Sequence, residues 1–151
     1  MTATYRIRPV SNTLDYFILH VSRTQKEMNA CLARWYKRNN EPIQNESNTA
    51  GLVHTSAVRE FAGETDGWYN ICFGHMFLNE ERLTSRIIAH ECLHISMAHE
   101  RYINHFDMMY AGCYDGCDEN EERLAYYVGD AVQAVMKELS RGGHWKRRKG
   151  K

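Results

Sequence analysis

The sequence has little proline, no long apolar run and no excess of charge of either sign. Proline occurs only at Pro9 and Pro42, and the longest apolar run is far shorter than the ~20 residues that a membrane-spanning helix needs. The N-terminal segment lacks a basic stretch followed by an apolar one, so we expect no secretory signal peptide. Basic and acidic residues both number 19. These absences exclude disordered, collagen-like and membrane-spanning chains, and they favour a cytoplasmic protein.

Cysteine is present, but it does not indicate a disulfide framework. The five cysteines are an odd number, which fits a reducing compartment. Cys113 and Cys117 form only one pair, so they indicate a structural zinc site weakly. The 151 residues, 43% of them hydrophobic, are enough for one core. We expect a single domain over 1–140 and a flexible tail over 141–151, because five of the last six residues are basic.

Hydrophobic periodicity predicts an α+β chain. Runs rich in β-forming residues predict strands over 16–21, 52–61 and 68–78, the last one bent at Gly74. Spacings of three and four predict helices that begin at Ser22 or Thr24, at Asn79 and at Asp118, and that end near 39, 99 and 139. The order is therefore strand, helix, strand, strand, helix, helix. It predicts a small sheet with helices packed on it.

The second predicted helix contains one motif with side chains suited to metal binding and catalysis. It is the HExxH sequence His90-Glu91-Cys92-Leu93-His94. Residues four apart lie on one face of a helix, so both imidazoles can bind one metal ion. Glu91 lies beside them, where it can take a proton from water that the metal activates. Composition alone predicts only about 0.04 occurrences of this pattern. We therefore predict a Zn²⁺ site with His90 and His94 as ligands and Glu91 as general base.

A catalytic zinc ion usually has a third protein ligand. Metzincins would place a histidine six residues after the second one, with a glycine between, but Glu100 and Met97 stand at these positions. Glu122 in the third predicted helix is the preferred candidate, because Ala125 and Gly129 share its helix face and would let the two helices approach closely. The alternatives are Glu121, Glu100 and His105.

Two parts of the chain together resemble a known family. Met76-Phe77-Leu78-Asn79 leads into the motif Ile88-Ala89-His90-Glu91-Cys92-Leu93-His94, and Glu121-Glu122-Arg123-Leu124-Ala125-Tyr126-Tyr127-Val128-Gly129 follows. These segments resemble the small gluzincin-type HExxH…E metallopeptidases, especially compact phage- or prophage-encoded ones, and the ImmA/IrrE-like family. The resemblance covers about residues 68–136, and the segment 100–117 departs from the family pattern.

The resemblance implies a zincin-like α+β fold, in which a small sheet packs on the HExxH helix and on a second long C-terminal helix. It also implies one catalytic zinc ion held by His90, His94 and Glu122, with Glu91 as general base. The implied activity is hydrolysis of peptide bonds in a cytoplasmic protein, in the host cytoplasm if the protein is phage-encoded. The expected partner is a peptide or protein substrate and not a membrane.

Further site residues stay open at the level of sequence. A histidine or tyrosine often stabilises the oxyanion in this chemistry, and the candidates are His99, Tyr102, His105, Tyr110, Tyr126 and His144. The aromatic-rich strand over 68–78 precedes the metal helix, and in zincins such a strand can pair with an extended substrate. Its aromatic side chains can equally belong to the core.

Two other functions fit the same sequence. The first is a zincin scaffold that binds or inhibits a partner without catalysis. The second is a SprT-like protease acting on DNA-bound protein, with His105 as third ligand and the basic tail, the one segment suited to nucleic acid, on the DNA. The intact Glu91 favours an enzyme, since a binding protein needs no general base.

Overall fold

The fold is taken from a computed structural model. It describes residues 1–9, 15–42, 49–55, 58–61, 69–104 and 118–145. In chain order, the elements of these segments are β1 (Ala3–Ile7), β2 (Tyr16–Ser22), α1 (Gln25–Asn39), β3 (Gly51–His54), β4 (Val58–Phe61), β5 (Tyr69–Asn79), the 3₁₀ turn η1 (Glu80–Arg82), α2 (Ser85–Asn104) and α3 (Asp118–Arg141). The chain is therefore an α+β protein, as predicted.

The strands form one mixed sheet in the order β1-β2-β5-β3, and β4 also pairs with β5. Strands β2 and β5 are parallel, and the other pairs are antiparallel. Strand β3 pairs with residues 75–78 of β5, and β4 pairs with residues 69–72 of β5. The two short strands therefore lie one after the other along the same side of β5. Within the described segments, β3 thus lies at an edge of the sheet and β5 lies inside it.

This topology corrects the expectation that the strand over 68–78 pairs with a substrate. β5 is hydrogen-bonded to β2 on one side and to β3 and β4 on the other, so its backbone groups are already used. The expected bend at Gly74 is confirmed as an irregular register, because Tyr16 pairs with Cys72 but Ile18 pairs with His75. A Cβ at Gly74 would lie 2.8 Å from the His54 carbonyl oxygen, so a side chain does not fit there.

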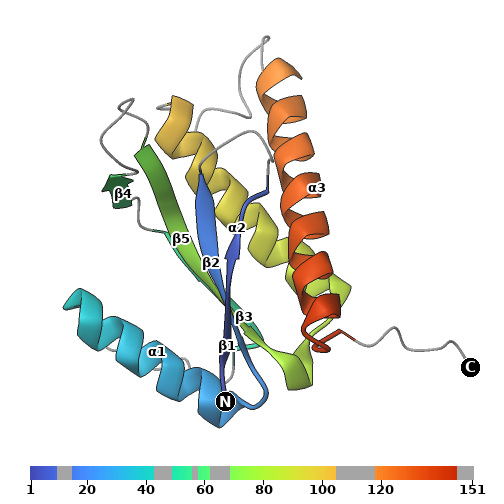
Figure 1. The fold of residues 1–151 in the computed structure, drawn as a ribbon. Coiled ribbons are helices and arrows are strands. Elements are labelled where there is room, and N and C mark those ends of the chain that lie inside the picture. The colour runs from blue at the N-terminus through green and yellow to red at the C-terminus, as the bar shows by residue number, and fades with distance from the viewer. Residues whose placement is uncertain (10–14, 43–48, 56–57, 62–68, 105–117, 146–151) are drawn as a thin grey trace, which may run out of the picture.

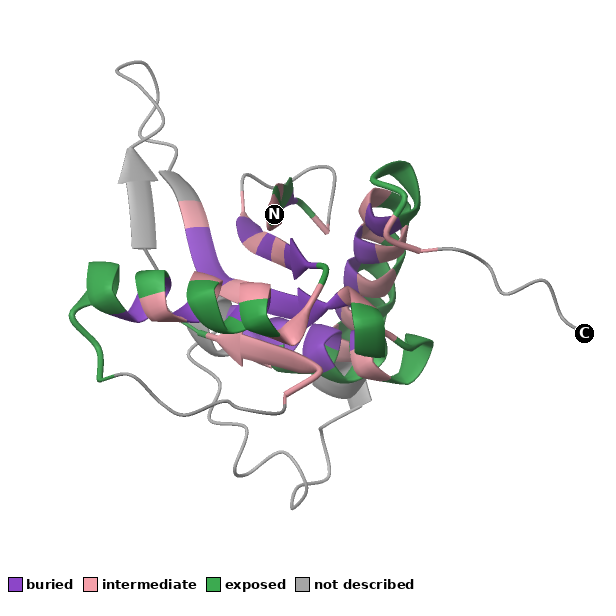
Figure 2. Ribbon diagram, turned by 90° about the horizontal axis from the view of Figure 1, so that it is seen from below, coloured by how far each residue is buried: buried purple, intermediate pink, exposed green. Residues whose placement is uncertain are grey.

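Helices cover both faces of the sheet, with α1 on one face and α2 and α3 side by side on the other (Figure 1). Buried residues concentrate in the strands and on the inner sides of the helices (Figure 2). The larger core joins the sheet to α2 and α3 through Ile7, Phe17, Leu19, Val21, Phe73, Met76, Leu78, Ile88, Cys92, Ile95, Tyr127, Ala131, Val135 and Leu139. The smaller one joins α1 to the sheet through Met28, Leu32, Trp35, Tyr36 and Phe77. None of the described helices combines the length and apolar character needed to cross a bilayer.

Most predicted elements are confirmed, and the differences lie at their boundaries. β1 was not predicted, and the strand expected over 52–61 is divided into β3 and β4. Asn79 caps η1 rather than α2, because its side-chain oxygen accepts a hydrogen bond from the Glu81 N–H at 3.1 Å. Helix α2 begins later, where the Thr84 hydroxyl accepts from the Ile87 N–H. It also continues past the expected end, to Asn104.

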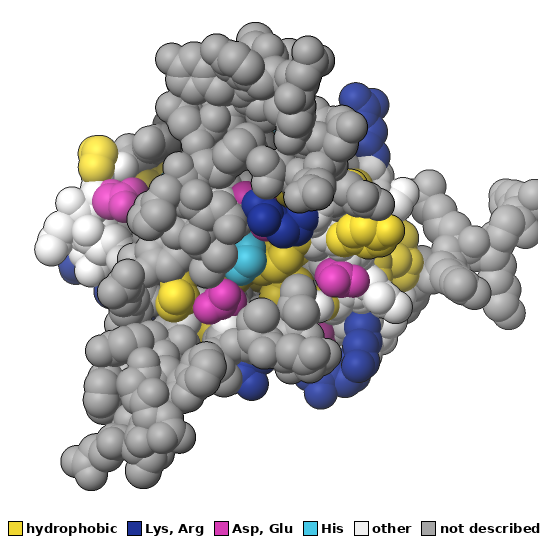
Figure 3. All heavy atoms as spheres, turned by 90° about the horizontal axis from the view of Figure 1, so that it is seen from above, with side chains coloured by type: hydrophobic (Ala, Val, Ile, Leu, Met, Phe, Trp, Pro, Cys, Tyr) yellow, Lys and Arg dark blue, Asp and Glu magenta, His cyan; other side chains and the backbone are white. Residues whose placement is uncertain are grey.

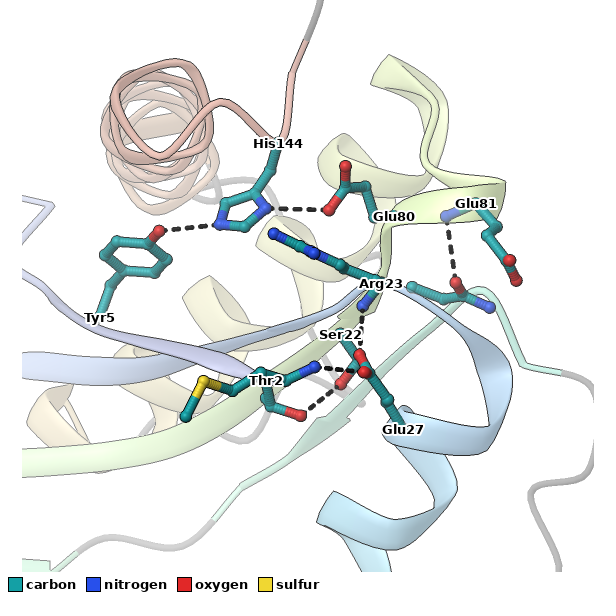
Figure 4. A network of polar contacts seen from close by, with 10 residues as sticks. Thr2, Tyr5, Ser22, Arg23, Glu27, Glu80, Glu81 and His144 are labelled. Carbon is teal, nitrogen blue, oxygen red and sulfur yellow. Dashed lines mark hydrogen bonds and ion pairs between the residues drawn. The ribbon is translucent and has the colours of Figure 1, made fainter.

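The segment after α3 folds back onto the domain (Figure 4). The imidazole of His144 contacts the Tyr5 hydroxyl at 2.9 Å with Nε2 and the Glu80 carboxylate at 2.9 Å with Nδ1. Trp145 packs against the larger core. The chain is thus attached to β1 and η1 as far as Trp145, beyond the expected tail boundary at 141. The basic residues of the expected tail, 146–151, lie outside the described residues.

Candidate metal centre

The two histidines of the HExxH motif lie next to each other on the exposed side of α2. Their side chains project away from the sheet, because the buried side of the helix is formed by Ile88, Cys92 and Ile95. The Nε2 atoms of His90 and His94 are 3.1 Å apart. Partial burial, and to a lesser extent the neighbouring His90, lower the pKa of His94. A low pKa keeps the imidazole neutral, which is the form that binds metal ions.

The spacing of these two nitrogens fits a shared zinc ion. Zinc binds histidine nitrogen at about 2.0–2.1 Å with tetrahedral angles, so two such ligands lie roughly 3.3 Å apart. The 3.1 Å between the His90 and His94 Nε2 atoms is close to this value. The distance between the two nitrogens is therefore compatible with one ion bound by both rings.

Glu91 points toward the edge strand β3 rather than into solvent. Its side chain is buried, with an exposed fraction of 6%, and it packs against Gly51, the first residue of β3. Burial raises the pKa of Glu91, while the neighbouring His90 acts in the opposite direction. The side chain of Glu91 is thus held against the start of β3, and His90 is close enough to influence the pKa of its carboxyl group. A general base of a hydrolase needs such a position, beside the metal and the substrate.

Glu122 lies in the first turns of α3, and its side chain is outside the described residues. Arg123, the next residue, contacts Glu100, which follows His94 by six residues, or about 9 Å along the helix axis. The start of α3 therefore lies beside the C-terminal half of α2, and the two helices run antiparallel. Of the sequence alternatives, Glu121 likewise has no described side chain, and His105 lies outside the described residues.

One expectation about α3 is wrong. Ala125 and Gly129 do not bring α3 close to α2: both are exposed, and no described atom lies within 4 Å of a Cβ built on Gly129. The buried face of α3 instead repeats every four residues from Tyr127 to Leu139. His90 and His94 are likewise exposed, on α2.

Glu100, a further alternative for the third ligand, is engaged elsewhere. Its oxygen Oε2 accepts hydrogen bonds from Arg123 at 2.9 and 3.1 Å, and its side chain is only 6% exposed. Six residues correspond to about 600° of helix rotation, so Glu100 projects from a different side of α2 than His94. These contacts remove Glu100 from the candidate ligands.

Glu100 belongs to a buried polar cluster where β2, α2 and α3 meet. His99 contacts Asp15 at 3.2 Å and stacks on Tyr127, with ring centroids 4.1 Å apart. Desolvation lowers the pKa of His99, although Asp15 and Glu100 oppose this effect. Burial, together with the nearby carboxylates, raises the pKa of Tyr127. Figure 3 shows this end of the molecule, where described acidic, basic, histidine and apolar side chains meet. The cluster fixes α3 to α2 and to the start of β2.

Replacing Arg123 should destabilise the protein. Arg123→Met leaves the buried Glu100 carboxylate without its guanidinium partner, which we expect to lower the free energy of unfolding by about 2 kcal/mol. Urea denaturation would measure this loss. Arg141→Met is the matched control, since Arg141 pairs with Glu138 on the surface and should cost less than about 1 kcal/mol. Equal losses in the two variants would contradict a structural role for the Arg123–Glu100 pair.

Among the candidates for oxyanion stabilisation whose side chains the structure describes, His99 and His144 have partners away from the histidine pair. His99 is buried in the polar cluster, and His144 lies between Tyr5 and Glu80. Tyr126 is 69% exposed on α3. Tyr102 lies in α2, but its side chain is outside the described residues, as are His105 and Tyr110 and the cysteines Cys113 and Cys117.

A row of histidines under α1 was not predicted from the sequence. His20, His75 and His54 occupy the adjacent strands β2, β5 and β3 on the face that α1 covers. The His20 and His75 rings are hydrogen-bonded at 3.0 Å, and Trp35 of α1 stacks on His54. The signal available in the sequence was one histidine in each of three predicted strands. Which face of each strand carries them depends on register, which the sequence does not give.

Comparison of the chain with protein-family models, with curated proteins and with solved structures gave no match. The functional assignment therefore depends on the motif and on the geometry of its site.

Proposed function

We propose that this protein is a zinc-dependent peptidase of the gluzincin type. The observation that carries the proposal is the pair of Nε2 atoms of His90 and His94, 3.1 Å apart, with Glu91, the residue that follows His90, buried against β3. In this proposal His90 and His94 are two zinc ligands, and the third is Glu122, which the resemblance implies and which lies in the first turns of the adjacent helix α3. The antiparallel edge strand beside the HExxH helix supports a zincin-like arrangement of the sheet.

Each residue of the site has a separate task in this reaction. Zinc, when bound, supplies a Lewis acid that polarises a peptide carbonyl and makes water more acidic. His90 and His94 would hold the ion. Glu91 accepts a proton from the attacking water and transfers it to the leaving amine. Because Glu91 is packed against β3, its carboxylate stays on the side of the site where that edge strand lies.

The edge strand β3 offers a place for the substrate. No strand of the described segments pairs with its outer edge, and its first residue, Gly51, touches Glu91. An extended peptide that added to this edge through backbone hydrogen bonds would pass beside the general base. This role replaces the one expected for the strand over 68–78, and it favours an unfolded or extended protein segment as substrate.

Metal analysis of the purified protein tests the proposal. We expect about one zinc ion per chain in the wild type and loss of bound zinc in His90→Ala and in His94→Ala, because removal of one ligand should weaken affinity more than about 100-fold. Arg86→Ala, an exposed change one turn before His90, is the control and should keep the ion.

The same assay identifies the third ligand. Glu122→Ala should lose zinc, whereas Glu121→Ala and His105→Ala should retain it. Loss in His105→Ala alone would transfer the role to His105 and favour the SprT-like arrangement. A wild-type protein that does not bind zinc at micromolar concentration would contradict the proposed function itself.

A further inference from the structure

We infer that Gly51 is a positioning residue for Glu91: the absence of a side chain at the start of β3 provides the space in which the Glu91 carboxylate is held. The inference depends on the proposed function only for the statement that Glu91 is the general base. The contact between the two residues does not depend on it.

The distances between Gly51 and Glu91 leave no room for a methyl group. A Cβ built on Gly51 would lie 2.7 Å from both Cγ and Oε1 of Glu91 and 2.9 Å from Cδ. Carbon atoms in contact prefer separations of about 3.5–4.0 Å. Any residue other than glycine would therefore displace either β3 or the side chain of Glu91.

The strand is the less mobile of these two partners. Gly51 is paired with Leu78 of the inner strand β5, and the carbonyl of the preceding Ala50 accepts a hydrogen bond from the Asn79 N–H at 3.0 Å. The backbone of Ala50 and Gly51 is thus attached to β5. Glu91 has three rotatable side-chain bonds, so a methyl group at position 51 would move its carboxylate.

Backbone conformation does not explain the glycine. Among the glycines of the described segments, only Gly143 has a positive φ. Gly51 is in an ordinary extended strand, where any residue is allowed and where glycine is disfavoured. What matters at Gly51 is therefore the absence of a side chain next to Glu91.

The test is a double-mutant cycle between Gly51→Ala and Glu91→Asp. Gly51→Ala should lower kcat for hydrolysis of fluorescein-labelled casein by about 100-fold, since a displacement of about 1 Å has this effect at a catalytic group. KM and zinc affinity should change by less than about threefold. In the Glu91→Asp background the shorter side chain leaves space, so the added methyl group should change kcat by less than about threefold.

Thermal unfolding of the metal-free proteins gives a readout that needs no activity. Gly51→Ala should lower Tm in the wild-type background and lower it less in the Glu91→Asp background, because directly contacting residues are energetically coupled. Gly129→Ala is the control. A Cβ at Gly129 would have no described atom within 4 Å, so the effect of this change on Tm should be the same in both backgrounds.

The outcomes separate this inference from the proposed function. Equal effects of Gly51→Ala in the two backgrounds, in Tm and in kcat, would overturn the positioning role while leaving a zinc peptidase in place. A wild-type protein without zinc or hydrolysis would overturn the proposed function, and coupling in Tm would then still support the contact. Reduced zinc affinity in Gly51→Ala would also overturn the inference, since Gly51 would then act on the metal ligands.

Discussion

Glu91→Gln should abolish peptide hydrolysis and leave the zinc content at about one ion per chain. Glutamine has the shape of glutamate, but its amide does not accept a proton from water. Loss of a general base lowers rates by about 10²–10⁴-fold. The histidine pair should be unaffected, because the Nε2 atoms of His90 and His94 project outward while Glu91 is buried against β3. Casein hydrolysis and metal analysis on the same preparation would measure both quantities.

The control for this variant is a glutamate of the same domain without a place in the site. Glu81→Gln serves, because Glu81 is exposed on η1, and it should hydrolyse casein at the wild-type rate. Full activity of Glu91→Gln would show that the reaction does not use Glu91 as a base. The remaining explanation of the motif would then be a metal-binding scaffold that acts by binding a partner.

The sequence predicted those features that depend on spacing within one element. The spacing of His90 and His94 is a property of one helix, so the proximity of the two rings follows once the segment is helical. The same holds for α3, whose fully buried residues Ala131, Val135 and Leu139 recur every four residues within one helix. In each case one element contains all the residues involved.

The sequence failed where the outcome depends on how two elements are placed against each other. Ala125 and Gly129 have the spacing of a close helix contact, yet they face outward, because Tyr127 stacks on His99 and thereby sets the rotation of α3. The position of the edge strand was missed for the same reason. Its location requires the pairing partners of β5, and these come from segments far apart in the chain.

The histidine row under α1 gives the second large effect, a dependence of stability on pH. His20 and His75 are partly buried on the sheet face that α1 covers, and His20 stacks on Phe77 with ring centroids 4.5 Å apart. Trp35 lies edge-to-face on His75. Desolvation is the main cause that lowers the pKa of both His20 and His75 to about 4, with smaller contributions from neighbouring histidines and from Arg38. Protonating either ring in place would bury a positive charge among aromatic side chains.

The sign of the effect follows from these pKa values. Both groups have a pKa of about 4 in the folded protein against 6.5 when unfolded, so between these values the unfolded chain binds more protons. Stability is then complete above pH 6.5 and falls as the pH drops from 6.5 toward 4. At pH 5, the ideal loss is about 2 kcal/mol for each histidine. Because both rings are partly exposed, we expect a combined loss of roughly 2–4 kcal/mol between pH 7.5 and pH 5.

Urea denaturation at pH 7.5, 6.5, 5.5 and 5.0 would measure this loss, and hydrogen exchange would locate it. Protection of amides in α1 should fall more steeply than in α3, because Trp35 and Phe77 belong to the contact between α1 and the sheet. The variant His20→Gln/His75→Gln should be less stable than the wild type at pH 7.5 and should lose at least 2 kcal/mol less on acidification. A matched change is Thr4→Val, which removes the hydroxyl 3.3 Å from His20 Nδ1 but keeps both titrating rings, so it should retain the wild-type slope. If the double variant kept that slope as well, the acid sensitivity would have to come from another group, with the buried His99 the first to test.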